Sequence, residues 1–277
     1  MAITNFQPTI WSAMVLESLK KNLVFGARAN RNYEGDVRFG NAVKINSVGA
    51  VAVRNYAGST TTDALSEATQ TLLINQQKYF SFNVDDINRV QSNADFANAA
   101  MMEAGYALAD SVDQYIASLH GDAGITATLG TDVTPIEINS ANVLTYLQLM
   151  FQKMTEANVP TSGRWAVIPP WFETKVKIAA QKIMTQNDSV VTSGYIGTIE
   201  GFDLYVSNNV VNTAGAKYKV LAGYSGSITL AQQIDKTEAL RDPAAFADIV
   251  RGLLVFGAKV VRANSLACLT CNIKAES

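Results

Sequence analysis

The sequence SNADFANAAMMEAGYALADSVDQYIASLH, residues 92–120, decides how the rest of the chain is interpreted. Apolar residues recur here every four positions, and others widen the same side; they are Phe96, Ala100, Met101, Ala104, Leu108, Val112, Tyr115, Ile116 and Leu119. This period predicts an amphipathic helix, with Ser92 or Asn93 as its N-cap and Gly121 as its stop. At 1.5 Å per residue it would be about 40 Å long, so we expect it to be the backbone of an elongated subunit.

The composition limits what the chain can do. Apolar residues make up 48% of its 277 residues, charged residues only 17%, and the net charge is −2. Since soluble domains usually carry about 25% charged residues, we expect much of the surface to contact other protein. The chain has no basic stripe for gripping nucleic acid, no apolar run of the roughly 18 residues that a membrane helix needs, and no signal-peptide pattern at its start. We therefore expect a globular protein made and used in the cytosol.

The residues before the long helix predict an arm and a hairpin. Residues 1–33 begin as an extended arm and become a short helix. Strand-like alternation follows over 37–53 and again over 72–84, with a polar stretch at 54–67 between the two runs. This pattern predicts a long two-stranded arm. Two interpretations remain open: a surface loop of its own subunit, or an arm that reaches onto a neighbour.

The residues after the long helix predict a compact α/β lobe and a β-rich end. Ser140 is the expected cap of a helix, and residues 164–168 are an expected buried strand. Further expected elements are a helix at 171–182, a polar loop at 187–199, and strands at 202–206 and within 217–234. Residues 246–273 predict paired strands that return to the long helix. The fold class is therefore α+β.

Residue types that carry chemistry are sparse. His120 lies at the carboxyl end of the long helix, where a cation is favoured by the helix dipole, so we interpret it as a cap. Cys268 and Cys271 have redox spacing but lie in a β-prone tail rather than at the start of a helix. Asp85 and Asp86 are adjacent, so on a strand they point to opposite faces and do not form a metal site. No nucleotide-binding or nucleophile motif occurs. We expect no catalytic, cofactor or metal site.

The order of these elements, together with short phrases along nearly the whole chain, resembles the major capsid (coat) proteins of tailed bacteriophages. Each phrase is unspecific alone, and their joint order carries the resemblance. The phrases include NRNYEGD at 30–36, QQKYF at 76–80 running into VDDI at 84–87, ADSVD at 109–113, GYIG at 194–197, SNN at 207–209, and RGL at 251–253 with GAK at 257–259.

The resemblance implies the Hong Kong 97-type capsid fold. Its parts would be an N-terminal arm at 1–33, an extended loop at 34–85, a peripheral domain with the spine helix at 86–138 and 236–277, and an axial domain at 139–235. It also implies pentamers and hexamers that build an icosahedral shell around packaged DNA, without sequence-specific DNA binding. Scaffolding, portal and decoration proteins would be partners. The shell would be assembled in the host cytoplasm and become the virion capsid.

On this resemblance, polar and turn-rich stretches become subunit contacts. We expect the tip of the extended loop, around Arg54, Tyr56 and Asp63, to lie on an adjacent subunit. The turn that contains Asn187 and Tyr195 is expected to face the capsomer axis. The nearest alternative keeps the fold and changes the purpose: an encapsulin, a cellular compartment that loads enzymes. A different class is a cytosolic enzyme that uses the inserted lobe, or Cys268 and Cys271 as a redox pair.

Overall fold

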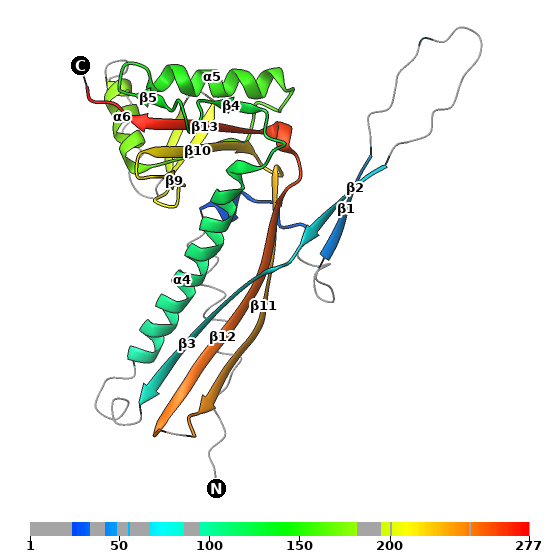
Figure 1. Ribbon diagram of the computed structural model, residues 1–277, viewed down its shortest axis with the longest axis vertical. Helices are drawn as coiled ribbons and strands as arrows, with labels where there is room; N and C mark the ends of the chain where they lie inside the picture. Colours follow the sequence, from blue (N-terminus) through cyan, green and yellow to red (C-terminus); the bar gives the residue numbers. More distant parts are fainter. Residues whose placement is uncertain are drawn as a thin grey trace.

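The computed structural model describes residues 24–33, 42–48, 55, 67–85, 95–181, 195–199, 201–243 and 245–276. An eight-stranded sheet with its helices forms one end of the molecule. A long helix and a three-stranded sheet extend from it, and a hairpin projects to one side (Figure 1). No helix among these described residues is long and apolar enough to span a membrane.

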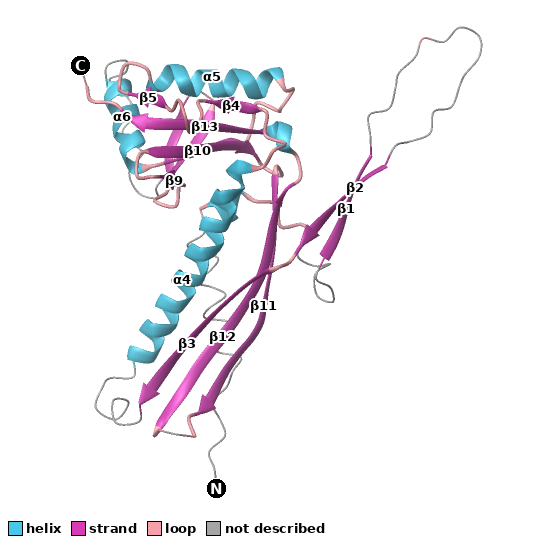
Figure 2. Cartoon of the chain, viewed as in Figure 1, coloured by secondary structure: helices cyan, strands magenta, loops and turns pink. Residues whose placement is uncertain are grey.

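The long helix predicted from the sequence is α4, Asp95–Ser118, followed by the 3-10 turn η2, Leu119–Gly121. Its expected caps Ser92 and Asn93 lie outside the described residues. Beside it runs an antiparallel sheet in the order β11 (Ile228–Arg241), β12 (Ala247–Val260) and β3 (Gln76–Asp85) (Figure 2). The prediction of a long helix at the centre of an elongated subunit is confirmed.

The stripe of α4 forms the core of the elongated part. Met101, Val112 and Ile116 are fully buried in one cluster with Leu254 and Phe256 of β12. The alternating side chains of β3, at positions 80, 82 and 84, pack against the same cluster. Each such side chain contributes about 1.5–3 kcal/mol on burial, so this shared face holds the helix to the sheet.

The eight-stranded sheet forms the second part. Its path is β4 (Ala127–Leu129), β13 (Leu266–Ile273), β10 (Lys217–Tyr224), β6 (Arg164–Ile168), β8 (Phe202–Val206) and β7 (Tyr195–Ile199). In addition, β5 (Ile136–Ile138) pairs with β13 and β9 (Asn212–Thr213) with β10. Helices α5 (Val143–Glu156) and α6 (Pro170–Gln181) pack with one face, while the other face shares the core of α4.

The carboxyl-terminal strands depart from the sequence-based expectation. Of the paired strands expected to return to the long helix, β12 does so, but β13 joins the eight-stranded sheet beside β10. The turn η3 (Ala263–Ser265) separates the two strands. The first six residues of β13 are buried, as its continuous apolar run requires of a strand inside a sheet. The division into peripheral and axial domains remains a prediction.

The hairpin is shorter than the alternation predicted. β1 (Ala42–Val48) pairs with β2 (Glu67–Leu73), whereas residues 76–85 form β3 and pair with β12. The expectation that the second run continues along the arm is therefore wrong beyond Leu73. The reason is that the apolar side chains of β3, which alternate along the strand, pack against the core of α4. The short helix α2 (Phe25–Arg28) lies inside the expected amino-terminal arm.

Helix α5 is not capped by Ser140, as the sequence predicts. Its N-cap position is Asn142, whose side chain makes no capping hydrogen bond. Asn139 Oδ1 accepts hydrogen bonds from the backbone N–H groups of Ala141 and Asn142, both at 3.1 Å, in the turn before the helix. The Ser140 hydroxyl instead donates to Glu276, 136 positions later in the sequence. A residue typical of caps is thus used for a long-range contact.

Candidate assembly surfaces

The described residues hold no grouping suited to metal binding: no cluster of three or more His, Cys, Asp or Glu side chains occurs among them. His120 lies in η2, and its Nδ1 is 3.0 Å from the carbonyl oxygen of Ala117. That contact places the imidazole on the last turn of the helix, as expected of a cap. Of the adjacent acidic pair, Asp85 ends β3 and Asp86 lies outside the described residues.

The two cysteines do not form a redox pair in this geometry. Both are free and buried in β13, three positions apart. Cys268 belongs to the core shared with α4, while Cys271 belongs to the core beneath α5 and α6, so they point to opposite faces of the sheet. Burial raises the thiol pKa of Cys268 to about 11 and that of Cys271 to about 12. Neither supplies a thiolate near neutral pH.

The structure leaves the predicted contact residues largely undescribed. Arg54, Tyr56, Asp63 and Asn187 lie outside the described residues. Tyr195 opens β7, the edge strand of the eight-stranded sheet, and only its backbone is described. Whether these positions lie close together is therefore not tested, and their contacts with other copies stay predictions.

The described base of the hairpin is anchored to the three-stranded sheet. Val43, Ile45 and Leu72 are buried against the outer side of that sheet, where Val255 and Val261 lie. Lys259 Nζ donates to the carbonyl oxygen of Thr71 (3.0 Å), and Gln70 donates to that of Val261 (3.2 Å). From this base the paired strands β1 and β2 project to one side of the three-stranded sheet (Figure 1). A firmly held base with a projecting end is suited to contact another molecule.

The strands approach so closely at Gly257 that a side chain does not fit. A Cβ built there would lie 2.1 Å from the carbonyl oxygen of Leu73. Only hydrogen at this position lets β2 cross β12, so Gly257 sets where the hairpin leaves the sheet. The sequence shows a glycine inside a strand pattern, which is the available signal for such a crossing.

Below the hairpin base, the same outer face of the sheet is open. Tyr79 on β3 is 78% exposed, and it lies opposite Leu253 of β12. Arg251 donates to Glu238 Oε2 from Nη2 (2.6 Å) and Nε (3.1 Å) beside it. These side chains surround a shallow hollow of about 470 Å³. We call this surface, formed by Tyr79, Ser81, Glu238, Arg251, Gly252 and Leu253, the open sheet face.

Sequence reasoning did not identify the open sheet face as a site. The available signal was the alternation of side chains along β3. Phe80 and Phe82 pack on the α4 core, and Tyr79, the residue next to Phe80, points to the other face of the sheet. An aromatic residue on the outward phase of a strand exposes a large apolar surface. Phe246, in the turn between β11 and β12, is likewise 83% exposed. Exposed aromatic side chains are typical of protein contact surfaces.

The end of the amino-terminal arm is held at a polar joint. Asp113 of α4 is only 2% exposed, and its carboxylate accepts the backbone N–H groups of Val24 (3.1 Å) and Gly26 (3.3 Å). Arg28 donates to the hydroxyl of Tyr205 in β8 (3.0 Å). Burial raises the pKa of Asp113 to about 6, against the opposing effect of these backbone donors. The joint therefore ties the arm to both parts of the fold.

The model of a phage capsid protein family matches residues 66–269, and no curated protein matches the chain. A solved chain titled "Mycobacterium phage Che8" is 31% identical, with 97% of this chain and 98% of that chain covered and a TM-score of 0.74. A chain titled "Capsid of Ralstonia phage GP4" is 13% identical, with coverages of 94% and 92% and a TM-score of 0.69.

A third similar structure is titled "Crystal structure of virus-like particle from Pyrococcus furiosus". It is 13% identical, covers 93% of this chain and 96% of that chain, and has a TM-score of 0.61. At that identity the likeness extends to the fold alone.

Proposed function

Because this chain belongs to the phage capsid protein family, we propose that its copies form pentamers and hexamers of an icosahedral shell that encloses the phage genome. The chain is a major capsid subunit with the Hong Kong 97-type fold, and its role is structural. It is located in the virion capsid. Assembly in the host cytoplasm, before the virion is complete, is part of the proposal.

The family match over residues 66–269 carries this proposal, and the hairpin supports it. The hairpin base is fixed by apolar packing and by the Lys259 and Gln70 hydrogen bonds, and its described strands β1 and β2 project to one side of the three-stranded sheet (Figure 1). A hairpin alone is marginal in water, so a projecting one gains stability when it contacts a second surface. We propose that this surface is an adjacent subunit, which Arg54, Tyr56 and Asp63 contact.

Other contacts follow from the capsid role. The stretch from Asn187 to Tyr195, the first residue of β7, is proposed to face the capsomer axis. Scaffolding and portal proteins are proposed partners, and a decoration protein is a further one. The net charge of −2 supports a shell that encloses DNA without gripping it, since phosphate binding relies on clustered Lys and Arg.

The assembly test is to express the chain alone and with a candidate scaffolding protein, then size the product by sedimentation and negative-stain microscopy. Closed particles, or five- and six-fold rings, are the expected result. A strictly monomeric protein under both conditions would contradict the proposal. Whether the particles contain DNA-packaging proteins or a cargo enzyme separates a phage shell from an encapsulin-type compartment, which the family match and the 31% relative favour less.

The loop-tip contact has its own test. Arg54→Ala and Asp63→Ala each remove a charged side chain without touching the described base of the hairpin. We expect lower assembly yield or lower particle melting temperature, with unchanged unfolding of the free subunit. Lys44→Ala, an exposed position on β1, is the control for loss of a charge on the hairpin. Unchanged yield and heat stability of the particles in both tip variants would refute the contact.

A further inference from the structure

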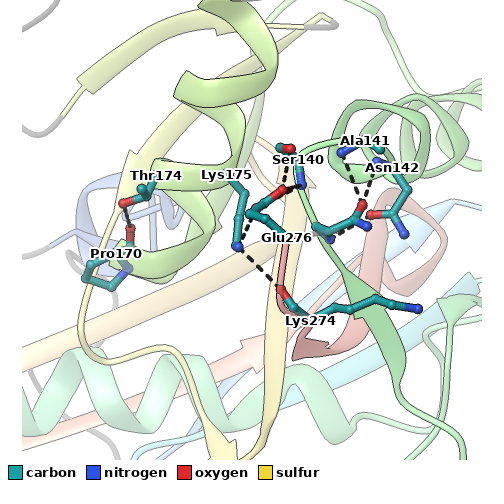
Figure 3. A network of polar contacts seen from close by, with 9 residues as sticks. Ser140, Ala141, Asn142, Pro170, Thr174, Lys175, Lys274 and Glu276 are labelled. Carbon is teal, nitrogen blue, oxygen red and sulfur yellow. Dashed lines mark hydrogen bonds and ion pairs between the residues drawn. The ribbon is translucent and has the colours of Figure 1, made fainter.

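The last described residues of the chain are hydrogen-bonded to the eight-stranded sheet and its helices. After β13, Lys274 N–H donates to the carbonyl oxygen of Ile138 (2.9 Å), which continues the pairing with β5. The chain then reaches the start of α5 and the side of α6, where Glu276 meets Ser140 and Lys175 (Figure 3). Three separate segments of the lobe, β5, α5 and α6, are therefore joined by residues 274–276.

The Glu276 carboxylate is the centre of this junction. It accepts the Ser140 hydroxyl (2.5 Å) and the Ser140 backbone N–H (3.3 Å), and it pairs with Lys175 Nζ. Lys175 Nζ also donates to the carbonyl oxygen of Lys274 (3.3 Å). Ser140 is 5% exposed and the Lys175 side chain 14%. The Lys175 and Ser140 donors hold the pKa of Glu276 down to about 2, so the carboxylate stays ionised at neutral pH.

Helix α6 is held both by apolar packing and by the directional hydrogen bonds at Glu276. Phe172 and Val176 anchor α6 in the core under the sheet. That apolar face sets which side of α6 turns toward the core. Charge-assisted hydrogen bonds are directional, and here they come from two segments onto one carboxylate. Through Glu276, Lys175 therefore ties α6 to Ser140, just before α5.

We propose that residues 274–276 are a strap that fixes α6 against the start of α5, and with it the carboxyl end of α6, Gln181. This inference rests on the proposed function, in which the chain between α6 and Tyr195 faces the capsomer axis. The strap makes the carboxyl end of the chain a determinant of axial contacts, although it is remote in sequence from them. Loosening the strap is expected to affect rings of subunits more than the fold of one subunit.

The test uses Glu276→Gln in the full chain, together with a chain truncated after Ile273. Amide hydrogen exchange in α6 is compared with exchange in α4, before and after assembly. Lys177→Met is the matched control on α6, because Lys177 is 51% exposed and pairs with Glu173 within the same helix. Lys153→Met is the control on α5, because Lys153 lies in its last turn, away from the junction.

In the free subunit we expect exchange in α6 to rise by roughly fivefold in Glu276→Gln and further in the truncated chain, with exchange in α4 unchanged. Both controls should stay at the wild-type rate. The yield of five- and six-fold rings should fall in the two strap variants. If exchange in α6 and ring yield in the strap variants equal those of the controls, the inference is overturned. If wild-type chains form no rings, the proposed function fails instead, while the exchange comparison still decides whether the strap holds α6.

Discussion

The Asp113 carboxylate in the middle of α4 accepts a hydrogen bond from the backbone N–H of Gly26, 87 positions earlier in the chain. The same carboxylate accepts the N–H of Val24, and Phe25 between them is buried in the α4 core. One buried side chain thus receives donors at the start of a four-residue helix too short to be stable alone. The end of the amino-terminal arm is fixed by tertiary contacts rather than by helix propensity.

Asp113 makes the stability of the subunit depend on pH in an unusual direction. Burial raises its pKa from 3.8 to about 6, so the folded state binds the proton more tightly than the unfolded state. Its contribution to stability is full below pH 4 and is lost as the pH rises through 6. The shift corresponds to about 3 kcal/mol at most. Asp113→Asn removes this titration, and the Asn side-chain oxygen can still accept an N–H.

The measurement is the free energy of unfolding by denaturant at several pH values between 4 and 7. As the pH rises from 4 to 7, the free energy of unfolding of Asp113→Asn should increase relative to that of the wild type, because only the wild type loses the contribution of the protonated Asp113. Glu103→Gln, at an exposed position on the same helix, is the control and should follow the wild-type slope. A pH-independent difference between Asp113→Asn and wild type would show that Asp113 is not responsible.

Gly257→Ala should weaken the attachment of the hairpin. The added methyl group would overlap the carbonyl oxygen of Leu73, so β2 or β12 must move. Overpacking of this kind costs about 1–3 kcal/mol. Gly121→Ala is the control, because nothing lies within 4 Å of a Cβ built there. Equal melting temperatures for the two variants would contradict the close crossing.

Arg164→Met should be among the more damaging single changes. Arg164 is 1% exposed, and its guanidinium donates to the carbonyl oxygens of Phe151, Val159 and Pro160 and to the Thr155 hydroxyl. It thereby satisfies backbone acceptors at and after the end of α5. Removing these donors leaves buried acceptors unpaired, which we expect to cost about 3 kcal/mol or more.

Denaturant unfolding measures that loss, and Arg262→Met is the control at an exposed arginine. The control should change the unfolding free energy by less than about 0.5 kcal/mol. A loss of similar size in both variants would mean that removing any arginine, rather than these hydrogen bonds, has the effect.

Sequence periodicity was sufficient for the elements and for the class of fold. The four-residue repeat of α4, the buried strand β6 and the helix after Pro169 lie where the pattern placed them, because each is set by its own apolar face. Which strands pair with each other was harder to predict. β3 and β13 were both recognised as strands, yet each pairs with a strand that local pattern does not specify.

Contacts between residues distant in the sequence, and exposed surfaces, were harder to predict for a related reason. Ser140 has the residue type of a cap, but its partner Glu276 lies 136 positions away, and no local pattern encodes that contact. Asp113 shares the buried side of α4 with Val112 and Ile116, so a carboxylate on an apolar stripe was a visible signal. Tyr79 carried the weaker signal of an aromatic residue in the outward phase.

The buried cysteines should be dispensable for assembly. Each thiol lies in a different core, so neither can reach the other without unfolding of β13. A thiol-reactive reagent should modify them only as fast as the subunit unfolds. Replacing both by Ala should leave the yield of particles unchanged and lower the unfolding free energy modestly. Rapid labelling of native particles, or loss of assembly in the double variant with an intact fold, would restore a functional role for the pair.

Tyr79→Ser tests the open sheet face as a contact between subunits. The side chain is 78% exposed, so its removal should change the unfolding free energy of the free subunit by less than about 0.5 kcal/mol. If a neighbouring copy covers it in the shell, the contact loses an aromatic anchor, and such residues contribute about 2 kcal/mol or more at interfaces. Assembly should then need a several-fold higher subunit concentration, measured by light scattering.

Tyr106→Ser is the matched control, because Tyr106 is also exposed (53%) but lies on α4, on the opposite side of the sheet. If Tyr79→Ser assembles at the wild-type concentration, the open sheet face remains uncovered in the shell. If both variants are impaired equally, the loss reflects exposed aromatic surface in general. A selective effect of Tyr79 would place a neighbouring subunit directly below the hairpin base, on the same face of the sheet.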